Sequence, residues 1–556
     1  MERHLVAVLL PKRDQGRHEA VRPLAVRVNG AQDPHLVTHP LEGTGLHRLL
    51  VSGRGMSSGA TAMLCRSLHR AHRRVTTVIR RSVSPARRSP SVHRTTRIAL
   101  IVVLALIALP AAAAKANPRM QIGFFDDPSF RWSKSTAENL QAASKSGATV
   151  IHVLADWSQI ASAKPASPLN GDDPAYKISD LDSLVSTAPK YGMQVIVSIT
   201  GTPKWANGGQ TPNHPPTNMG DLTAFAHMLA ARYNGLHPGY GVVSRFAIWN
   251  EPNLQLFLTP QFENGQIVSP GIYAKLFAAG YAGIKAGNPL ALVAAGNTSN
   301  RGHNTPTGGV SDSTAPATFA RLLAIAAPKL KFDAWATHPY PTSPNLPPTQ
   351  KVQYPAVTLT TLDQFGSDLK TWWKRRVPIW ITEYGEQTRP QYSIGVSASQ
   401  QAADAKTALQ MAAKNPYVDI FVWFIFRDST NQTWFSGLKN ANGSNKPSYA
   451  TFSATAKTVA GQTYYIPQGG GFTPAIDVPQ LFNNNPVGSR IGLTYAVFEG
   501  KKKIAVGQPP ATLAANGTVS APISFRDVKG HTYSVVVKLG DKHGVTVTRT
   551  IAVIAQ

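Results

Sequence analysis

Between Met120 and Phe426, short apolar runs of strand length alternate with longer segments that have helical periodicity. This alternation predicts repeated β/α units whose parallel strands are buried on both faces. We count eight such runs, at Met120–Phe125, Thr149–Leu154, Gln194–Ile199, Arg245–Trp249, Ala291–Ala295, Phe332–Thr337, Pro378–Thr382 and Asp419–Phe426. This count of eight is the feature that most narrows the possible folds, because eight parallel β/α units can close into a barrel.

The segments between the runs predict helices that cover the outside of the strands. They are Ser135–Ser146, Asp221–Tyr233, Gly271–Ala286, Ala317–Ala327, Thr360–Lys374 and Ser399–Ala413, with a last helix near Tyr449–Val459. We therefore predict a (β/α)8 TIM barrel over residues 117–460. A doubly wound open sheet is the alternative, but its G-x-G-x-x-G turn after the first strand is absent.

The composition changes after the last predicted helix. Gly469–Gly471, several prolines and Asn483–Asn485 are typical of a linker, which we predict over residues 461–488. From residue 489 to 556 the apolar period becomes two, in alternating segments such as Ile491–Phe498 and Tyr533–Leu539. This pattern predicts a small all-β module, an Ig-like sandwich, with sugar binding and a spacer role both open.

The net charge of +27 is concentrated at the N-terminal end. Residues 1–97 hold 18 basic and 5 acidic residues, and residues 51–97 contain no acidic residue. An apolar run, Ile98–Leu109, follows directly, with the small residues Ala111–Ala114 after it. We predict a basic extension over 1–97 and a signal peptide over 98–116, or an uncleaved anchor through residues 98–114. A signal peptide or an anchor would both place the rest of the chain outside the cell. An extracellular position argues against a nucleic-acid partner.

Few residues suggest a metal or a cofactor. The only cysteine, Cys65, precedes the predicted signal peptide, so the exported part has no disulfide and no cysteine-based metal site. His214, His303 and His338 belong to different predicted loops and lack H-E-x-x-H spacing. We expect no metal and no cofactor.

Polar residues follow several of the predicted strands, at the barrel end where catalytic groups stand in this fold. Glu251 follows the fourth run and Glu383 follows the seventh, so the two carboxyl groups are expected to face each other. A pair of carboxyl groups about 5 to 5.5 Å apart suits cleavage of a glycosidic bond with retention. A single glutamate at a strand end would more often be a solvated surface group.

Other side chains at the same end predict a carbohydrate site. Asn250 could bond a sugar hydroxyl, and His338 with Tyr340 could hold the charge of Glu383. The indole rings of Trp157, Trp205 and Trp423 could stack on sugar rings, although each is also a natural barrel-packing residue. Of the three, Trp423 is the strongest candidate for a sugar platform.

The motifs Trp249-Asn250-Glu251-Pro252 and Ile381-Thr382-Glu383-Tyr384-Gly385, with His338-x-Tyr340 between them, resemble clan A glycoside hydrolases. The cellulase-type family five and the xylosidase-type family thirty-nine are closest in style, over roughly residues 120–458. The resemblance implies that Glu251 is the acid/base and Glu383 the nucleophile of a retaining glycosidase. One position departs from the pattern, because His152 stands where clan members commonly place an arginine near the nucleophile.

The mechanism requires opposite protonation states of the two glutamates. We expect Glu383 to stay ionised and Glu251 to hold its proton more tightly. The sequence therefore predicts a secreted, monomeric retaining glycoside hydrolase that acts on a poly- or oligosaccharide. A carbohydrate-binding cell-surface protein that lost catalysis, and a transglycosylase that remodels wall glycans, stay open as alternatives.

Overall fold

The computed structural model describes residues 120–555 except 238, 432, 460–462, 467–471, 483–484 and 515–517. The predicted basic extension and signal peptide lie outside the described residues. In the described part of the chain, none of the helices combines the length and the apolar character that crossing a bilayer requires.

Eight parallel strands form a closed barrel in the order β1-β10-β9-β8-β7-β4-β3-β2. The strands are β1 (Gln121–Phe125), β2 (Val150–Asp156), β3 (Gln194–Thr200), β4 (Arg245–Ile248), β7 (Leu292–Ser299), β8 (Ala334–His338), β9 (Ile379–Ile381) and β10 (Val418–Phe424). Each of the eight predicted runs contains one of them, apart from shifts of a few residues at the ends. The predicted barrel is therefore confirmed.

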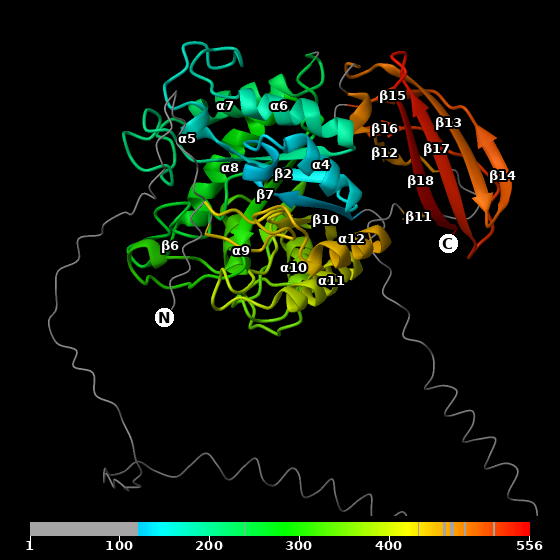
Figure 1. Cartoon of the computed structure of the whole chain (residues 1–556). Coiled ribbons are helices and arrows are strands. Elements are labelled where there is room, and N and C mark those ends of the chain that lie inside the picture. The colour runs from blue at the N-terminus through cyan, green and yellow to red at the C-terminus, as the bar shows by residue number, and fades with distance from the viewer. Residues whose placement is uncertain are drawn as a thin grey trace, which may run out of the picture. The chain divides into compact units, whose positions relative to one another are not determined.

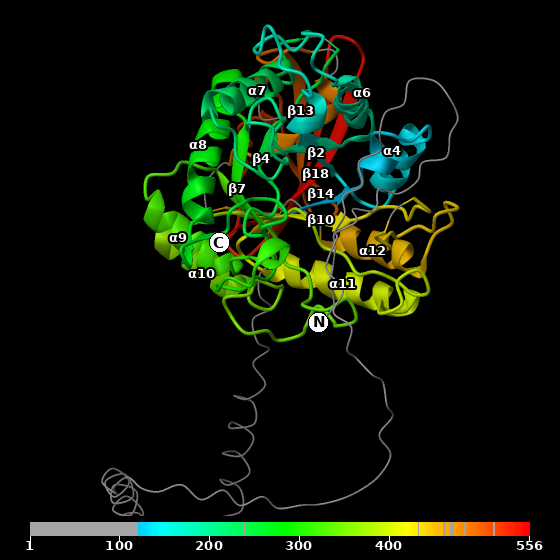
Figure 2. The same cartoon turned by 90° about the vertical axis from the view of Figure 1, so that its left-hand side faces the viewer.

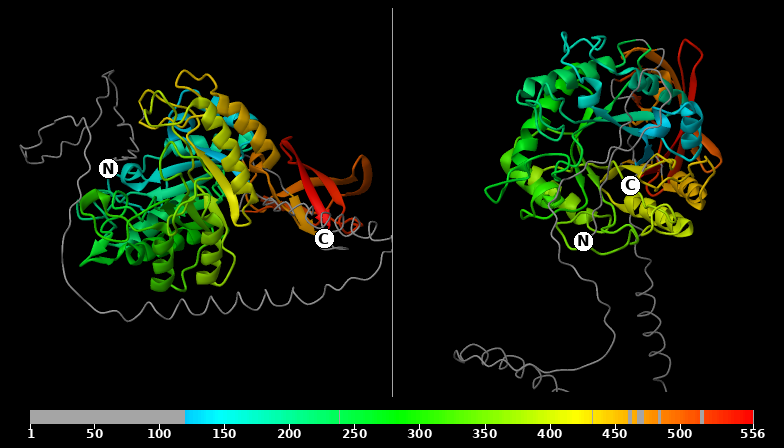
Figure 3. Two further views of the ribbon diagram at one scale, coloured as in Figure 1. Left: turned by 90° about the horizontal axis from the view of Figure 1, so that it is seen from below. Right: turned by 60° about the vertical axis from the view of Figure 1, so that its left-hand side comes forward.

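Helices surround the barrel, as Figure 2 and the right panel of Figure 3 show. The larger ones are α4 (Thr136–Lys145), α6 (Ser179–Thr187), α7 (Met219–Arg232), α8 (Ser269–Gly287), α9 (Pro316–Ala326), α10 (Leu362–Trp373), α11 (Ala398–Lys414) and α12 (Pro447–Val459). Short elements in the loops are α3 (Asp127–Phe130), α5 (Trp157–Ile160), η1 (Ala188–Tyr191), β5 (Phe262–Glu263), β6 (Gln266–Ile267) and η2 (Gly309–Ser311).

Local sequence explains where some of the helices begin and how closely they pack. Asn218 caps α7 by accepting a hydrogen bond from the backbone N–H of Gly220, and Ser397 caps α11 in the same way through Gln400. Gly283 of α8 lies so near α7 that a Cβ atom there would come within 2.2 Å of the carbonyl oxygen of Thr223. The absence of a side chain at Gly283 lets the two helices approach closely.

The barrel has two apolar layers that alternate along each strand. In β10, Ile420 and Val422 belong to the inner cluster together with Trp380, whereas Phe421 and Trp423 pack outward with the helices. This alternation is the period of two expected for a strand. It decides which aromatic residues can reach the mouth of the barrel.

The residues after the barrel form β structure (Figure 1). The strands are β11 (Thr463–Ile466), β12 (Ala475–Asp477), β13 (Arg490–Glu499), β14 (Lys502–Gly507), β15 (Ala511–Leu513), β16 (Thr518–Ser520), β17 (Thr532–Gly540) and β18 (Thr546–Ala555). They are hydrogen-bonded in the order β11-β18-β17-β13-β15-β16-β12, and β14 lies off this path. β13 pairs antiparallel with β14, β15 and β17, and a buried core contains Leu493, Val535 and Ile551.

The predicted linker over residues 461–488 is wrong for much of its length. β11 pairs with β18, β12 pairs with β16, and η3 (Pro479–Leu481) lies between β12 and β13. Val478 and Leu481 are fully buried in the core of the β region. Glycine, proline and asparagine dominate the composition here and conceal these short apolar segments.

Candidate active site

Two glutamates lie directly after barrel strands, at the carboxyl end of the barrel. Glu251 follows β4 and Glu383 follows β9, and they are 7% and 6% exposed. His338, the last residue of β8, lies between them and is fully buried. Three strands distant in sequence thus bring their polar ends together.

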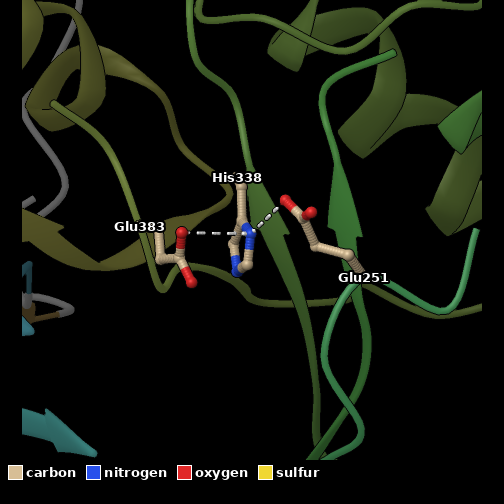
Figure 4. Close-up of side chains that lie close together, drawn as sticks. All are labelled: Glu251, His338 and Glu383. Carbon is tan, nitrogen blue, oxygen red and sulfur yellow. Dashed lines mark hydrogen bonds and ion pairs between the residues drawn. The ribbon is translucent and has the colours of Figure 1, made fainter. Parts of the chain in front are cut away.

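His338 bridges the two carboxyl groups (Figure 4). Its Nδ1 atom lies 2.9 Å from Oε1 of Glu251 and 3.6 Å from Oε2 of Glu383. One ligand atom from each of the three residues lies within 4.8 Å of the other two. The two carboxyl groups therefore share one small site. The sequence predicted that they would meet, and the geometry agrees with that prediction.

Tyr340 holds the second glutamate. Its hydroxyl donates a hydrogen bond of 2.9 Å to Oε2 of Glu383, as predicted from the His-x-Tyr motif. The Tyr340 ring stacks on Tyr384 at 6.1 Å between centroids, so its orientation is fixed by packing. His338, in contrast, lies closer to Glu251 than to Glu383, whereas the sequence assigned it to Glu383.

The surroundings of Glu383 and His338 raise the pKa values of both side chains. Burial raises the pKa of Glu383 to about 7, His338 and Tyr340 oppose this increase, and Glu251 adds to it. The sequence analysis expected Glu383 to stay ionised, whereas a pKa near neutral pH leaves it partly protonated there, because the barrel mouth takes its carboxyl group out of water. Burial lowers the pKa of His338, but the two carboxylates outweigh burial and the net change is upward.

His152 does not replace the missing arginine. It lies in β2 and is fully buried, its Nδ1 faces the Thr382 carbonyl oxygen at 3.1 Å, and its Nε2 faces Ser198 Oγ at 2.7 Å. Burial, followed by the nearby His338, lowers its pKa to about 3, so the ring is neutral. A neutral, fully buried ring supplies no cation to Glu383 and cannot reach a substrate, so a substrate-binding role for His152 is wrong. The ring instead contacts the backbone carbonyl oxygen of Thr382, the residue before Glu383.

The predicted sugar platforms at Trp157 and Trp423 are also wrong. Trp423 is fully buried on the helix-facing side of β10, and its Nε1–H donates to the carbonyl oxygen of Ser436. Trp157 is 1% exposed and stacks on Phe225 of α7. Both indoles pack the outer layer of the barrel.

Trp205 is half-buried, with one edge against Trp157 and Lys164 over its ring. Its Nε1–H donates to the Ala161 carbonyl oxygen. Asn250 is 4% exposed, and its Oδ1 atom lies 3.4 Å from Nδ2 of Asn297. Substrate contacts of Trp205 and Asn250 stay predictions.

Two aromatic residues that the sequence analysis missed pack on each other, and one of them packs on Tyr340. Trp434 is half-buried in the loop after β10, with its ring 5.8 Å from that of Tyr340. Phe424, the last residue of β10, lies 5.6 Å from the Trp434 ring and is also half-buried. The position of Phe424 at a strand end could have identified it, whereas no periodicity marks Trp434.

The same Glu251, His338 and Glu383 group has spacing that could hold a metal ion. Each of the three side chains already has a hydrogen-bond partner within the site or in its immediate surroundings. The absence of a metal site stays a prediction.

Comparison with known proteins identifies the chemistry of the barrel. The family model described as cellulase, glycosyl hydrolase family 5, matches residues 115–428. The chain belongs to glycosyl hydrolase family 5, and it is a glycosidase of a retaining family. No curated protein matches the chain.

Several solved structures match the chain at low identity. A family 39 glycoside hydrolase from Bacteroides cellulosilyticus WH2 is 19% identical, with 73% of this chain and 80% of that chain covered and a TM-score of 0.45. A family 39 β-xylosidase from Caulobacter crescentus is 15% identical, with coverages of 77% and 80% and a TM-score of 0.44. The GH5_18 enzyme from Streptomyces cattleya is 14% identical, with coverages of 66% and 88% and a TM-score of 0.44.

Proposed function

We propose that this chain hydrolyses O-glycosidic bonds of a poly- or oligosaccharide by double displacement, with Glu251 as acid/base and Glu383 as nucleophile. One observation carries the proposal: an oxygen of each carboxyl group lies within 4.8 Å of the other, with His338 between them. This spacing leaves no room for the water molecule that an inverting enzyme places between substrate and base, at about 6.5 to 9.5 Å.

In the first step the Glu251 carboxyl group protonates the glycosidic oxygen, and the Glu383 carboxylate attacks the anomeric carbon. The bond to the leaving alcohol breaks as an ester to Glu383 forms. In the second step Glu251 takes a proton from water, whose oxygen attacks the same carbon and releases Glu383 as a carboxylate. The protons and electrons balance without a cofactor.

The environment of the two carboxyl groups supports this division of labour. The Tyr340 hydroxyl donates to Oε2 of Glu383, which favours the ionised form of the nucleophile. His338 Nδ1 lies nearer Glu251 than Glu383, so it is better placed to share a proton with the acid/base. The nucleophile thus has a hydroxyl donor, and the acid/base has a proton-sharing partner.

Azide rescue tests the two assignments separately. With activated aryl glycosides, azide should restore turnover to both Glu251→Ala and Glu383→Ala, because a small anion enters the space left by either carboxylate. The glycosyl azide should keep the substrate's anomeric configuration with Glu251→Ala and invert it with Glu383→Ala. Glu386→Gln is the matched control, because Glu386 lies in the same segment, is buried, and bonds the Tyr384 hydroxyl through an oxygen that glutamine keeps, so it should retain wild-type turnover. Wild-type rates in Glu251→Ala or Glu383→Ala would refute the proposal.

The remaining features of the chain fit an extracellular enzyme. The acid-free basic stretch 51–97 before the apolar run Ile98–Leu109 supports export, so we propose a secreted or anchored monomer that binds carbohydrate. The β region after the barrel, with β13 shared among three pairings and an apolar core, supports an Ig-like sandwich module. N-terminal sequencing of protein from the culture medium tests export, and a first residue near 117 is expected.

A further inference from the structure

A bulge in strand β7 places one asparagine at the centre of the site. The pairing of β7 with β8 shifts register between Gly296 and Thr298, so Asn297 is an extra residue in the strand. Its φ is 52°, in the left-handed region that asparagine tolerates better than most residues. Bulges of this kind redirect a side chain, and here the Asn297 amide is fully buried among the catalytic groups.

Asn297 bonds both strained residues of the turn that carries Glu251. Trp249 and Glu251 have φ values of 73° and 37°, in the left-handed region that is strained for residues other than glycine. The Asn297 Nδ2 atom donates to the Trp249 carbonyl oxygen at 2.8 Å. The backbone carbonyl oxygen of Asn297 accepts a hydrogen bond from the backbone N–H of Glu251 at 2.9 Å. The backbone from which Glu251 projects is therefore held by this one residue on two sides.

The side-chain oxygen of Asn297 determines which ring nitrogen of His338 carries a hydrogen. Since the Trp249 carbonyl can only accept, Nδ2 must face it, and Oδ1 of Asn297 must face the other way. That oxygen accepts from the Thr382 hydroxyl at 2.7 Å and faces Nε2 of His338 at 3.2 Å. An amide oxygen cannot donate, so Nε2 carries the hydrogen. Nδ1 is then left to share a proton with Glu251.

We propose that Asn297 is a positioning residue that sets both the conformation of Glu251 and the tautomer of His338. Through Thr382 the same amide oxygen also reaches the residue before Glu383. A single side chain thereby links the ends of β4, β8 and β9 to β7. The effect on turnover rests on the proposed function, whereas the tautomer does not.

The first test reads the tautomer directly. Long-range ¹⁵N–¹H NMR of ring-labelled protein, assigned with His338→Gln and recorded at a pH where the ring is neutral, should show hydrogen on Nε2 alone in the wild type. In Asn297→Ala the signal should move toward the Nδ1–H form, because the acceptor for Nε2–H is gone. An unchanged tautomer in Asn297→Ala would overturn the proposal, and this result does not depend on any glycosidase activity.

The second test reads turnover and its pH dependence. Asn297→Ala should lower kcat by about 30-fold, with KM within about threefold of the wild type, and should displace a limb of the pH profile. The titratable groups that face His338 are Glu251, Glu383, Tyr340 and His152, none of which the variant removes. Wild-type kcat and an unchanged profile in Asn297→Ala would contradict the proposal.

Two further variants separate positioning from general damage. Thr298→Val removes a buried hydroxyl from the same bulge, where Thr298 bonds Thr337 but neither Glu251 nor His338, so kcat should stay within about twofold. Asn297→Asp keeps the acceptor for His338 but loses the donor to Trp249. If Asn297→Ala fails to fold, Asn297→Asp is measured in its place, with the Nε2–H tautomer retained and a lowered kcat expected. Wild-type kcat in Asn297→Asp, or an equal loss in Thr298→Val, would overturn the proposal.

Discussion

The Tyr340 hydroxyl donates a hydrogen bond of 2.9 Å to Oε2 of Glu383, a carboxyl group whose pKa burial raises to about 7. The bond stabilises the ionised form and so limits that increase. Because only the carboxylate can attack the anomeric carbon, kcat/KM of the wild type should fall as the pH drops below about 7.

Removing the hydroxyl should move this acid limb to higher pH. Tyr340→Phe takes away a group that lowers the pKa of Glu383, so the limb should shift upward by about one pH unit, on the scale of one hydrogen bond to a charged group. The pH profiles of kcat/KM for wild type and variant test this shift. An acid limb that stays in place, or moves to lower pH, would show that Tyr340 does not stabilise the carboxylate.

Replacing the bridging histidine should impair both glutamates. His338→Ala removes the proton-sharing partner of Glu251 and a ring that, when protonated, lowers the pKa of Glu383. We expect kcat to fall about 100-fold, in the range of a lost acid–base contribution, with the acid limb also displaced upward. Steady-state kinetics across pH measure both effects, and a variant that changes only KM would contradict the role of His338.

Glu386 offers a test of stability rather than catalysis. This residue is 1% exposed, and burial, then the neighbouring Asp404, raise its pKa to about 9. Between pH 4.5 and about 9 the folded state keeps a proton that the unfolded chain releases, so stability declines as the pH rises through that window. Glutamine mimics the protonated side chain, so Glu386→Gln should raise the free energy of unfolding by about 2 kcal/mol at pH 8 and hardly at pH 4.

Denaturation at the two pH values measures this difference. Glu138→Gln, at an exposed position of α4, serves as the control and should change little at either pH. Equal destabilisation by Glu386→Gln at pH 4 and pH 8 would mean that the proton on Glu386 does not limit stability.

Two tryptophans should respond in opposite ways. Trp423→Ala empties a fully buried site and should cost about 3 to 5 kcal/mol of stability. Trp434→Ala removes a half-buried ring beside Tyr340 and should raise KM about tenfold with a small change in Tm. Thermal melts together with KM on an oligosaccharide separate the two, and a folded Trp423→Ala with raised KM would reverse the assignment.

Periodicity predicted the barrel because eight buried strands carry continuous apolar runs, and Glu251 and Glu383 stand out as charges where those runs end. The same continuity hid the orientation of Trp423. In β10 both faces are apolar, so Ile420 and Val422 inside the barrel look like Phe421 and Trp423 outside it.

Asn297 was missed for a different reason. The predicted run stopped at Ala295, whereas β7 continues to Ser299 through a bulge. The pair Gly296-Asn297 was the available signal, since glycine inside a strand often marks a bulge. The ionisation of Glu383 and His152 depends on how deeply each is buried, which no local pattern reports.

Covalent trapping tests the central claim most directly. A 2-deoxy-2-fluoro glycoside with a good leaving group slows release of the glycosyl-enzyme more than its formation, so the sugar should accumulate on the protein. Peptide mass spectrometry should then find one added fluoro-sugar on the peptide that contains Glu383, and none in Glu383→Ala. Labelling of Glu251 or of another residue, or turnover of a cleavable substrate with full activity in Glu383→Ala, would contradict the account.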